Sequence, residues 1–156
     1  MGTTPGGATS PPPEDGHGEG RARVTGSSAV EAARYTGTYP GRPDQVWRAC
    51  RDVARHLAGH PASDDAVLIT SELASNAVLH SSSKGQFFTV RAEIFPGYLW
   101  LEVEDLGGPW NPKPRDAARP HGLDVIEALT GQDNWGVAGT EAGRVVWCRL
   151  EMKAQR

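Results

Sequence analysis

Two polar side chains lie one helical turn apart in a segment that is otherwise rich in apolar residues. Glu72 and Asn76 are four residues apart, so in a helix they project from the same side. The helical wheel places them between two apolar arcs, which consist of Ile69, Leu73 and Ala77 on one flank and Leu68 and Leu79 on the other. A carboxylate and an amide enclosed in this way need polar partners, because an unpaired buried carboxylate is costly. They are therefore either ligand-binding groups or a hydrogen-bonded pair at the rim of the core.

A second carboxylate is predicted on the inward face of a strand. Asp105 continues the alternating series Leu99, Leu101 and Val103. Gly107 and Gly108 follow it and permit a flat ligand to approach the backbone closely. Such a carboxylate can accept a hydrogen bond from an exocyclic amine while a ring fills the apolar cavity. The alternative interpretation is an Asx-type turn that begins the loop.

The elements that must position these residues follow from the hydrophobic periodicity. Apolar residues at three- and four-residue spacing predict helices over residues 43–57, 63–80 and 123–130, with Ser63 as the N-cap of the second helix and with Ser71 and Ser75 facing solvent. Alternation predicts strands over residues 34–39, 86–95, 98–106, 134–138 and 144–151. Helices and strands that each carry one apolar face predict a two-layer α/β sandwich, in which helices cover one face of a mostly antiparallel mixed sheet.

Composition sets the boundaries of this domain. The chain has 156 residues, which is room for one ordinary domain. Residues 1–33 are predicted to be a disordered tail because Gly, Pro, Ser and Thr dominate them, and residues 34–152 form the domain. The formal charge of −3 indicates neither direct nucleic-acid binding nor attraction to an anionic membrane. Without a secretory signal or an apolar span of membrane length, we expect a cytoplasmic protein. The spacing of Cys50 and Cys148 favours buried thiols over a disulfide or a metal site.

Three motifs resemble those of a known superfamily. The segment Glu72-Leu-Ala-Ser-Asn76-Ala-Val-Leu-His80 resembles the N-box of the histidine-kinase-like (GHKL, or Bergerat) ATPases. Asp105-Leu-Gly107 resembles their first glycine box, and His121-Gly122-Leu123 resembles part of the second. The motifs occur in family-like order and spacing, and the similarity extends over residues 35–150. The sequence is most similar to small actinobacterial anti-sigma factors that are serine-protein kinases.

The resemblance implies a role for each matched residue, with ATP and Mg²⁺ as cofactors and the Bergerat ATP-binding fold as the scaffold. Glu72 would be the general base, and Asn76 would coordinate Mg²⁺. Asp105 would bind the adenine amine, and Gly107 would let the purine lie close. The second glycine box, Gly122 and Leu123, would present backbone N–H groups to phosphate. Residues 107–120 correspond to the ATP lid, in which Arg119 is either a charge partner of the ligand or a solvated loop residue.

Two positions depart from the family pattern. Pro120 replaces a glycine of the second glycine box, which removes one N–H donor and stiffens the lid hinge. The Thr of a Gly-Thr pair near the last strand is also missing, because Val145 and Val146 follow Arg144. Both changes bear on tight ATP binding and turnover, and they leave Glu72 in place.

The implied function is an ATP- and Mg²⁺-dependent protein serine/threonine kinase that binds a sigma factor and phosphorylates an anti-sigma-factor antagonist. Members of this group often form homodimers, although no residue pattern in this chain shows one. The alternative is a non-catalytic nucleotide-binding regulatory module that sequesters a protein partner. A histidine kinase is disfavoured, because no dimerisation helix with a phospho-accepting His precedes the domain.

Overall fold

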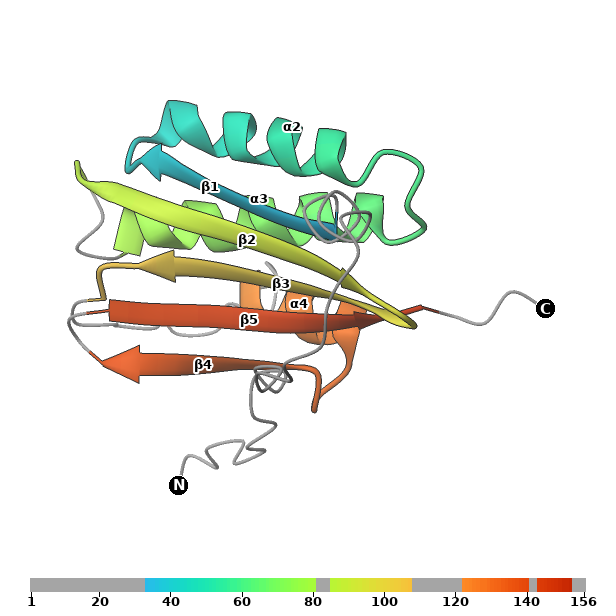
Figure 1. Ribbon diagram of the computed structural model, residues 1–156. Coiled ribbons are helices and arrows are strands. Elements are labelled where there is room, and N and C mark those ends of the chain that lie inside the picture. Colours follow the sequence, from blue (N-terminus) through green and yellow to red (C-terminus); the bar gives the residue numbers. More distant parts are fainter. Residues whose placement is uncertain (1–32, 81–84, 108–121, 141–142, 153–156) are drawn as a thin grey trace, which may run out of the picture.

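The computed structural model describes most of the predicted domain (Figure 1). The described residues are 33–80, 85–107, 122–140 and 143–152. The predicted tail before Ala33 lies outside them, as do Arg119, Pro120 and His121. The predictions of a disordered tail and of an ATP lid therefore stay predictions.

The described strands form one five-stranded sheet with the order β1-β2-β3-β5-β4. The strands are β1 (Arg34–Pro40), β2 (Phe87–Phe95), β3 (Tyr98–Asp105), β4 (Trp135–Thr140) and β5 (Gly143–Glu151). The neighbours pair antiparallel throughout, so the sheet is not mixed over the described residues. Two hairpins, β2–β3 and β4–β5, supply two of the four pairings and fix this sense, because a short connection reverses the chain. The predicted two-layer α/β sandwich is confirmed.

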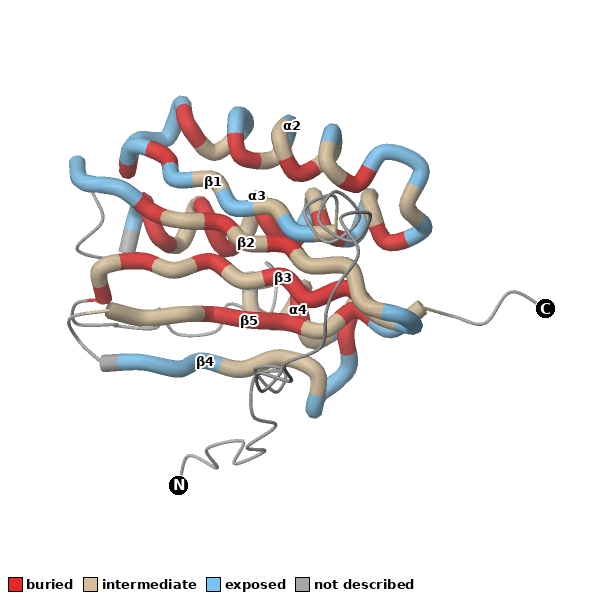
Figure 2. The backbone as a smooth tube through the Cα atoms, viewed as in Figure 1, coloured by how far each residue is buried: buried red, intermediate tan, exposed pale blue. Residues whose placement is uncertain are grey.

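The helices lie against one face of the sheet (Figure 1). They are the short 3₁₀ helix η1 (Pro43–Gln45), α2 (Val46–His56), α3 (Ser63–His80) and α4 (Gly122–Thr130). Alternate residues of the strands point toward this helical layer, so buried and half-buried positions alternate along β2 (Figure 2). The residues predicted to face inward on the three central strands are buried, apart from Ile94, which is half-buried: Phe88, Val90, Ala92, Leu99, Leu101, Val103, Val146, Cys148 and Leu150.

The predicted surroundings of α3 are only half correct. Ile69, Leu73 and Ala77 are at most 2 % exposed, as expected. The second apolar arc is exposed instead, with Leu68 at 45 % and Leu79 at 59 %. The reason is that α3 packs against both the sheet and α2, so its buried side extends toward α2 rather than toward these two leucines. The N-cap prediction is also shifted by one residue, since the Ala62 carbonyl already accepts the Ala66 N–H at 2.9 Å.

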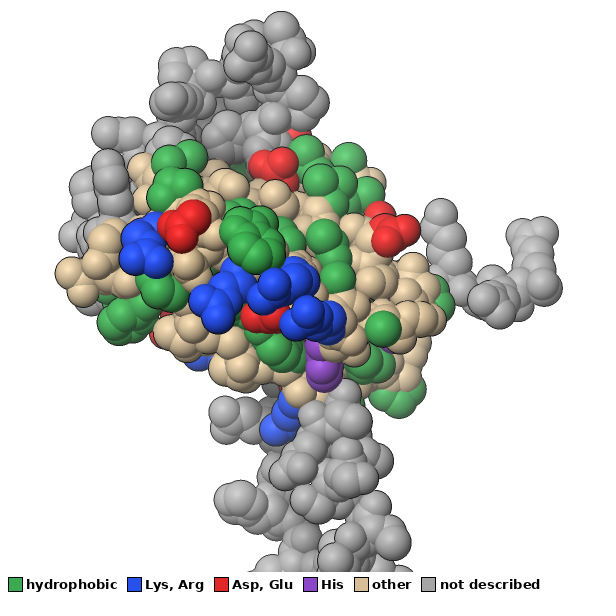
Figure 3. Space-filling view, turned by 90° about the horizontal axis from the view of Figure 1, so that it is seen from above, with side chains coloured by type: hydrophobic (Ala, Val, Ile, Leu, Met, Phe, Trp, Pro, Cys, Tyr) green, Lys and Arg blue, Asp and Glu red, His purple; other side chains and the backbone are tan. Residues whose placement is uncertain are grey.

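Helix α2 is amphipathic, and this fixes its orientation. Ala49, Val53 and Leu57 recur at four-residue spacing and are fully buried. Arg48 and Arg51, which lie on the other side, are exposed, as is Arg55. Figure 3 shows Lys and Arg side chains gathered over this outward face, with hydrophobic side chains beside them.

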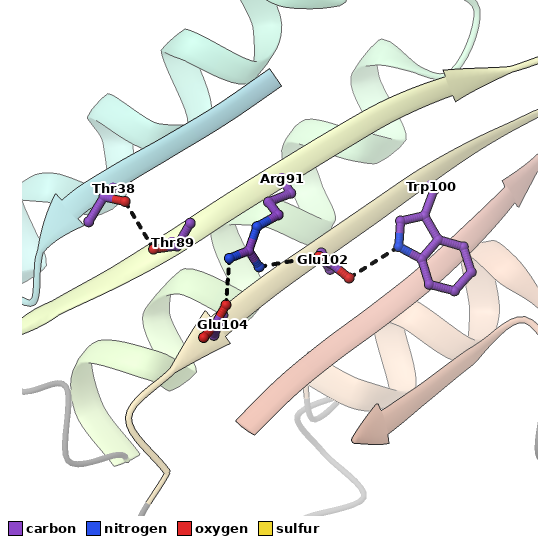
Figure 4. A network of polar contacts seen from close by, with 6 residues as sticks. All are labelled: Thr38, Thr89, Arg91, Trp100, Glu102 and Glu104. Carbon is purple, nitrogen blue, oxygen red and sulfur yellow. Dashed lines mark hydrogen bonds and ion pairs between the residues drawn. The ribbon is translucent and has the colours of Figure 1, made fainter. Parts of the chain in front are cut away.

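The sheet face away from the helices is held by polar pairs between strands (Figure 4). Arg91 donates to Glu102 at 3.2 Å and to Glu104 at 2.6 Å, and the Trp100 indole N–H donates to Glu102 at 3.2 Å. These pairs are partly exposed, so each contributes at most about 1 kcal/mol. They support the register of β2 and β3, and thereby the position of Asp105 on the opposite face.

The two cysteines differ in burial. Cys148 is fully buried, which raises the pKa of its thiol to about 12. Cys50 is half-buried, its S–H lies 3.8 Å from the Val67 carbonyl oxygen, and burial raises its pKa less. Both are free thiols, and the burial predicted for both is complete only for Cys148.

Alkaline pH is expected to destabilise the fold. The Cys148 thiol ionises near pH 9 in an unfolded chain and only near pH 12 in the folded one. The unfolded state therefore binds fewer protons in this window, so the stabilisation is fully present below pH 9 and is lost as the pH rises toward 12. Burial also raises the pKa of the Tyr39 hydroxyl, which adds in the same direction. Urea unfolding at stepped pH should show the free energy of unfolding falling by about 1.4 kcal/mol per pH unit for each such proton.

The control for this prediction is Cys148→Ala. Below pH 9 its free energy of unfolding should be lower than that of the wild type because of the cavity it leaves. Between pH 9 and 12, the free energy of unfolding of this variant should fall less steeply with pH, by the contribution of one proton. An identical slope in both proteins would show that Cys148 does not titrate as its burial requires.

Candidate functional site

Asp105 ends β3 and faces the helical layer. Its side chain is 6 % exposed. Its Oδ1 atom accepts the backbone N–H of Gly107 at 2.7 Å, so the Asx-type turn offered as the alternative interpretation is present. Gly107 has a φ of 72°, a left-handed conformation that favours glycine. The turn holds the carboxylate at the end of β3, beside the buried Gly107, which has no side chain of its own.

Arg144 is a further candidate site residue, which the sequence motifs did not identify. Its Nη2 atom donates to Asp105 Oδ2 at 2.9 Å, and its side chain is only 11 % exposed. The two residues are directly opposite each other in the β3–β5 register. A signal was available, because Arg144 continues the inward alternation of Val146 and Cys148. The sequence analysis considered this position only for the threonine that it lacks.

The paired carboxylate keeps acceptor capacity for a further hydrogen bond. Each carboxylate oxygen offers about two acceptor positions, and the known partners take one on each oxygen. An exocyclic amine can therefore add a hydrogen bond without displacing Arg144. The guanidinium also fixes the orientation of the carboxylate, which suits a hydrogen-bond acceptor for a ring.

Glu72 and Asn76 lie in the C-terminal half of α3 and are both half-buried. Figure 1 shows that the C-terminal end of α3 and the end of β3 lie at the same end of the molecule. Asn76 and Asp105 are thus brought to one end of the sandwich, and Glu72 lies one turn farther along. No hydrogen bond joins Glu72 to Asn76 among the described residues, so the rim-pair interpretation loses its main support.

Glu72 and Asn76 lie between a buried flank and an exposed flank of α3. One side of Glu72 and Asn76 is closed by Ile69, Leu73 and Ala77, which belong to the core. The other side borders the exposed Leu68 and Leu79. The two half-buried polar groups therefore lie at the boundary between core and solvent.

The second glycine box is only partly described. Gly122 is the first residue of α4, so its backbone lies at the positive end of the helix dipole, as the resemblance implies for a phosphate contact. Leu123 is half-buried and packs against the core, so a ligand would meet its backbone rather than its side chain. Pro120 and Arg119 lie outside the described residues.

The candidate metal ligands among the described residues are sparse. In the described part of the chain, no group of three His, Cys, Asp or Glu side chains forms a metal site. Mg²⁺ commonly takes one or two protein oxygens and completes its shell with water and phosphate oxygens. The amide of Asn76 near the carboxylate of Glu72 matches that sparse protein contribution.

Comparison with solved structures supports the architecture. No family model matches the sequence, and no curated protein matches it. The crystal structure of the RsbU and RsbW domains of Rv1364c from Mycobacterium tuberculosis is similar, with a TM-score of 0.60 and 20 % sequence identity. The two proteins share a fold. The match covers 76 % of this chain and 32 % of that one, so this chain spans about a third of the similar protein. Within the described residues, no helix is both long and apolar enough to cross a lipid bilayer.

Proposed function

We propose that this protein binds ATP with Mg²⁺ and acts as an anti-sigma-factor-type protein serine/threonine kinase. The observation that carries the proposal is the buried carboxylate of Asp105 on the helix-covered face, followed by Gly107 in a left-handed conformation. The motif resemblance and the fold shared with an RsbU–RsbW domain structure support it. The substrate would be a Ser or Thr hydroxyl of an anti-sigma-factor antagonist, and the inhibited partner a sigma factor.

Asp105 would accept the exocyclic amine of adenine, and Gly107 would leave space for the face of the purine. Arg144 adds a feature of its own to this site, since it holds the carboxylate from the neighbouring strand β5. An arginine is a charged, forked donor, so it can hold a carboxylate in one orientation. The purine would thus meet a preorganised carboxylate.

The phosphate end would be served by α3 and α4. Bound Mg²⁺ would neutralise charge on the phosphates, and the oxygen of Asn76 would hold the ion. The N-terminus of α4 at Gly122 would donate backbone N–H groups to phosphate. Glu72 would accept the proton of the attacking hydroxyl or orient it. Catalysis would rest mainly on positioning and charge stabilisation.

One sequence feature favours a second candidate, a nucleotide-binding regulatory module without turnover. Pro120 cannot donate an N–H where the family uses glycine, so one phosphate contact is lost. Such a module would keep Asp105 and the nucleotide and would act by sequestering its partner.

Titration calorimetry with ATP and Mg²⁺, followed by phosphotransfer from labelled ATP to a panel of antagonist proteins, separates the candidates. The kinase proposal predicts saturable ATP binding and label on a Ser or Thr of an antagonist. ATP binding with no transfer to any antagonist would leave the regulatory module. Absence of ATP binding would contradict both candidates.

A further inference from the structure

A second surface feature lies between α2 and α3. The two helices enclose an apolar groove of about 680 Å³, whose walls include Val46, Trp47, Cys50, Val67, Leu68 and Leu79. Trp47 and Leu79 are each 59 % exposed, and Leu68 is 45 % exposed. These are three of the five large hydrophobic side chains that are exposed in the described residues. Apolar area concentrated in this way marks an interaction surface more often than scattered exposure does.

Positive charge lies beside this groove along α2, whereas the charged side chain in the described groove lining itself is that of Asp64 on α3. Arg51 and Arg55 follow Trp47 at four-residue spacing along α2, and Arg48 lies beside them on the same exposed face (Figure 3). The Arg51 guanidinium lies 4.8 Å from the centre of the Trp47 ring. The ion pair of Arg51 with Asp52 is long at 3.8 Å and partly exposed, so it does little to neutralise the row. The row is basic in a chain whose formal charge is −3, which makes the charge local to α2.

We propose that this groove binds an amphipathic helix of another protein, with apolar side chains in the groove and Asp or Glu side chains against the arginine row. The walls are helices, so their backbone groups are already paired and cannot accept an added strand. Helix α2 has 11 residues, which corresponds to a length of about 16 Å and to about three turns of a bound helix. Because the arginine row on α2 is positively charged, a partner with acidic side chains complements it.

Other occupants fit less well. In a symmetric contact between two copies, the arginine rows of both α2 helices would approach each other across the two-fold axis. The chain's own first 28 residues hold Val24 as the only large aliphatic residue after Met1, which is too few apolar anchors for the groove. A nucleic acid would use the arginines but would leave the apolar walls uncovered.

The groove and the candidate site share the exposed side of α3. Ser71 and Ser75 line the groove, which corrects the expectation that they face open solvent, whereas Glu72 and Asn76 do not line it. On the helical wheel Leu68 and Leu79 lie between the two sets. A helix seated in the groove would therefore border Glu72. Docking of a helix in this groove does not require a bound nucleotide, so its test is independent of the test of the proposed function.

The test uses the full chain and two labelled 16-residue helical peptides, designed with Leu at positions i, i+3, i+4 and i+7. One peptide carries Glu at the flanking positions and the other carries Lys. Fluorescence anisotropy should show at least tenfold tighter binding of the Glu peptide. Leu68→Ser with Leu79→Ser should weaken it at least tenfold, and Arg51→Glu with Arg55→Glu should reverse the preference toward the Lys peptide.

Phe87→Ser is the matched control, because Phe87 is 49 % exposed and lies on β2 away from the groove. It should leave the binding of both peptides unchanged, and Asp105→Asn should do the same even if it removes ATP binding.

Circular dichroism checks that each variant is folded, and the exposure of the altered residues predicts that all groove variants are. Equal binding of both peptides, no binding, or indifference to the leucine and arginine changes would overturn the proposal. If the protein forms a dimer and the leucine changes dissociate it, the occupant is a second copy and the proposal is overturned. If duplex DNA binds through the arginine row, the occupant is a nucleic acid and the proposal is likewise overturned.

Discussion

Asp105→Asn is expected to abolish detectable ATP binding and to lower the free energy of unfolding by about 2–4 kcal/mol. The carboxylate is 6 % exposed and holds two polar contacts, with the Gly107 N–H and the Arg144 guanidinium. An amide that replaces it removes the charge that balances Arg144 in a largely buried position. It also removes an acceptor for the adenine amine. Titration calorimetry and urea unfolding measure the two effects separately.

The stability effect and the binding effect can be told apart with a double variant. Asp105→Asn combined with Arg144→Gln removes both charges, so it should recover part of the lost stability without restoring ATP binding. Glu104→Gln is the matched control on the same strand, because its ion pair with Arg91 lies on the outer face and is partly exposed. We expect it to change the free energy of unfolding by less than about 1 kcal/mol. If Asp105→Asn kept the affinity for ATP, the assignment of this carboxylate to the nucleotide would be wrong.

Glu72→Gln is expected to lower the rate of phosphotransfer by about 100-fold or more while ATP affinity changes little. The substitution keeps the size and hydrogen-bonding capacity of the half-buried side chain but removes its ability to accept a proton. Glu72 lies at the solvent boundary of α3, so little stability should be lost. Single-turnover transfer from ATP to the antagonist measures the rate, and calorimetry measures the affinity.

Two comparisons make this result specific. Glu93→Gln changes an equally half-buried glutamate on the opposite face of the sheet, which pairs with Arg34, and it should leave transfer unchanged. Asn76→Ala should instead weaken binding of the magnesium nucleotide and so affect both readouts. Transfer at the wild-type rate by Glu72→Gln would show that another group takes the proton.

The α3 helix shows where local sequence reasoning stops. Its extent and its buried stripe of Ile69, Leu73 and Ala77 were predicted, because a 3.6-residue repeat is a local property of the chain. The exposure of Leu68 and Leu79 was not predicted. The helical wheel shows two apolar arcs, but only the position of α2 decides which one is covered. The exposed arc, Leu68 and Leu79, forms part of the groove between α2 and α3. The surface feature proposed as a docking site is therefore the one that the helical wheel did not predict.

Arg144 shows the same limit on the sheet. Its inward direction could be obtained from the alternation of β5, yet its pairing with Asp105 depends on which residues of β3 and β5 stand opposite each other. That register joins positions 39 residues apart. It is set by turns and by the packing of both strands against the helices, none of which is visible in either segment alone.

The sequence by itself determined the helices and strands, their inward faces and the three motifs that resemble an ATP-binding superfamily, because periodicity and motif spacing are written along the chain. The tertiary structure alone decided that Asp105 shares its carboxylate with Arg144, that Glu72 and Asn76 stand at the edge of the core, and that Trp47, Leu68 and Leu79 stay exposed. Each of these depends on which elements meet, since burial and ion pairing are properties of neighbours in space rather than in sequence.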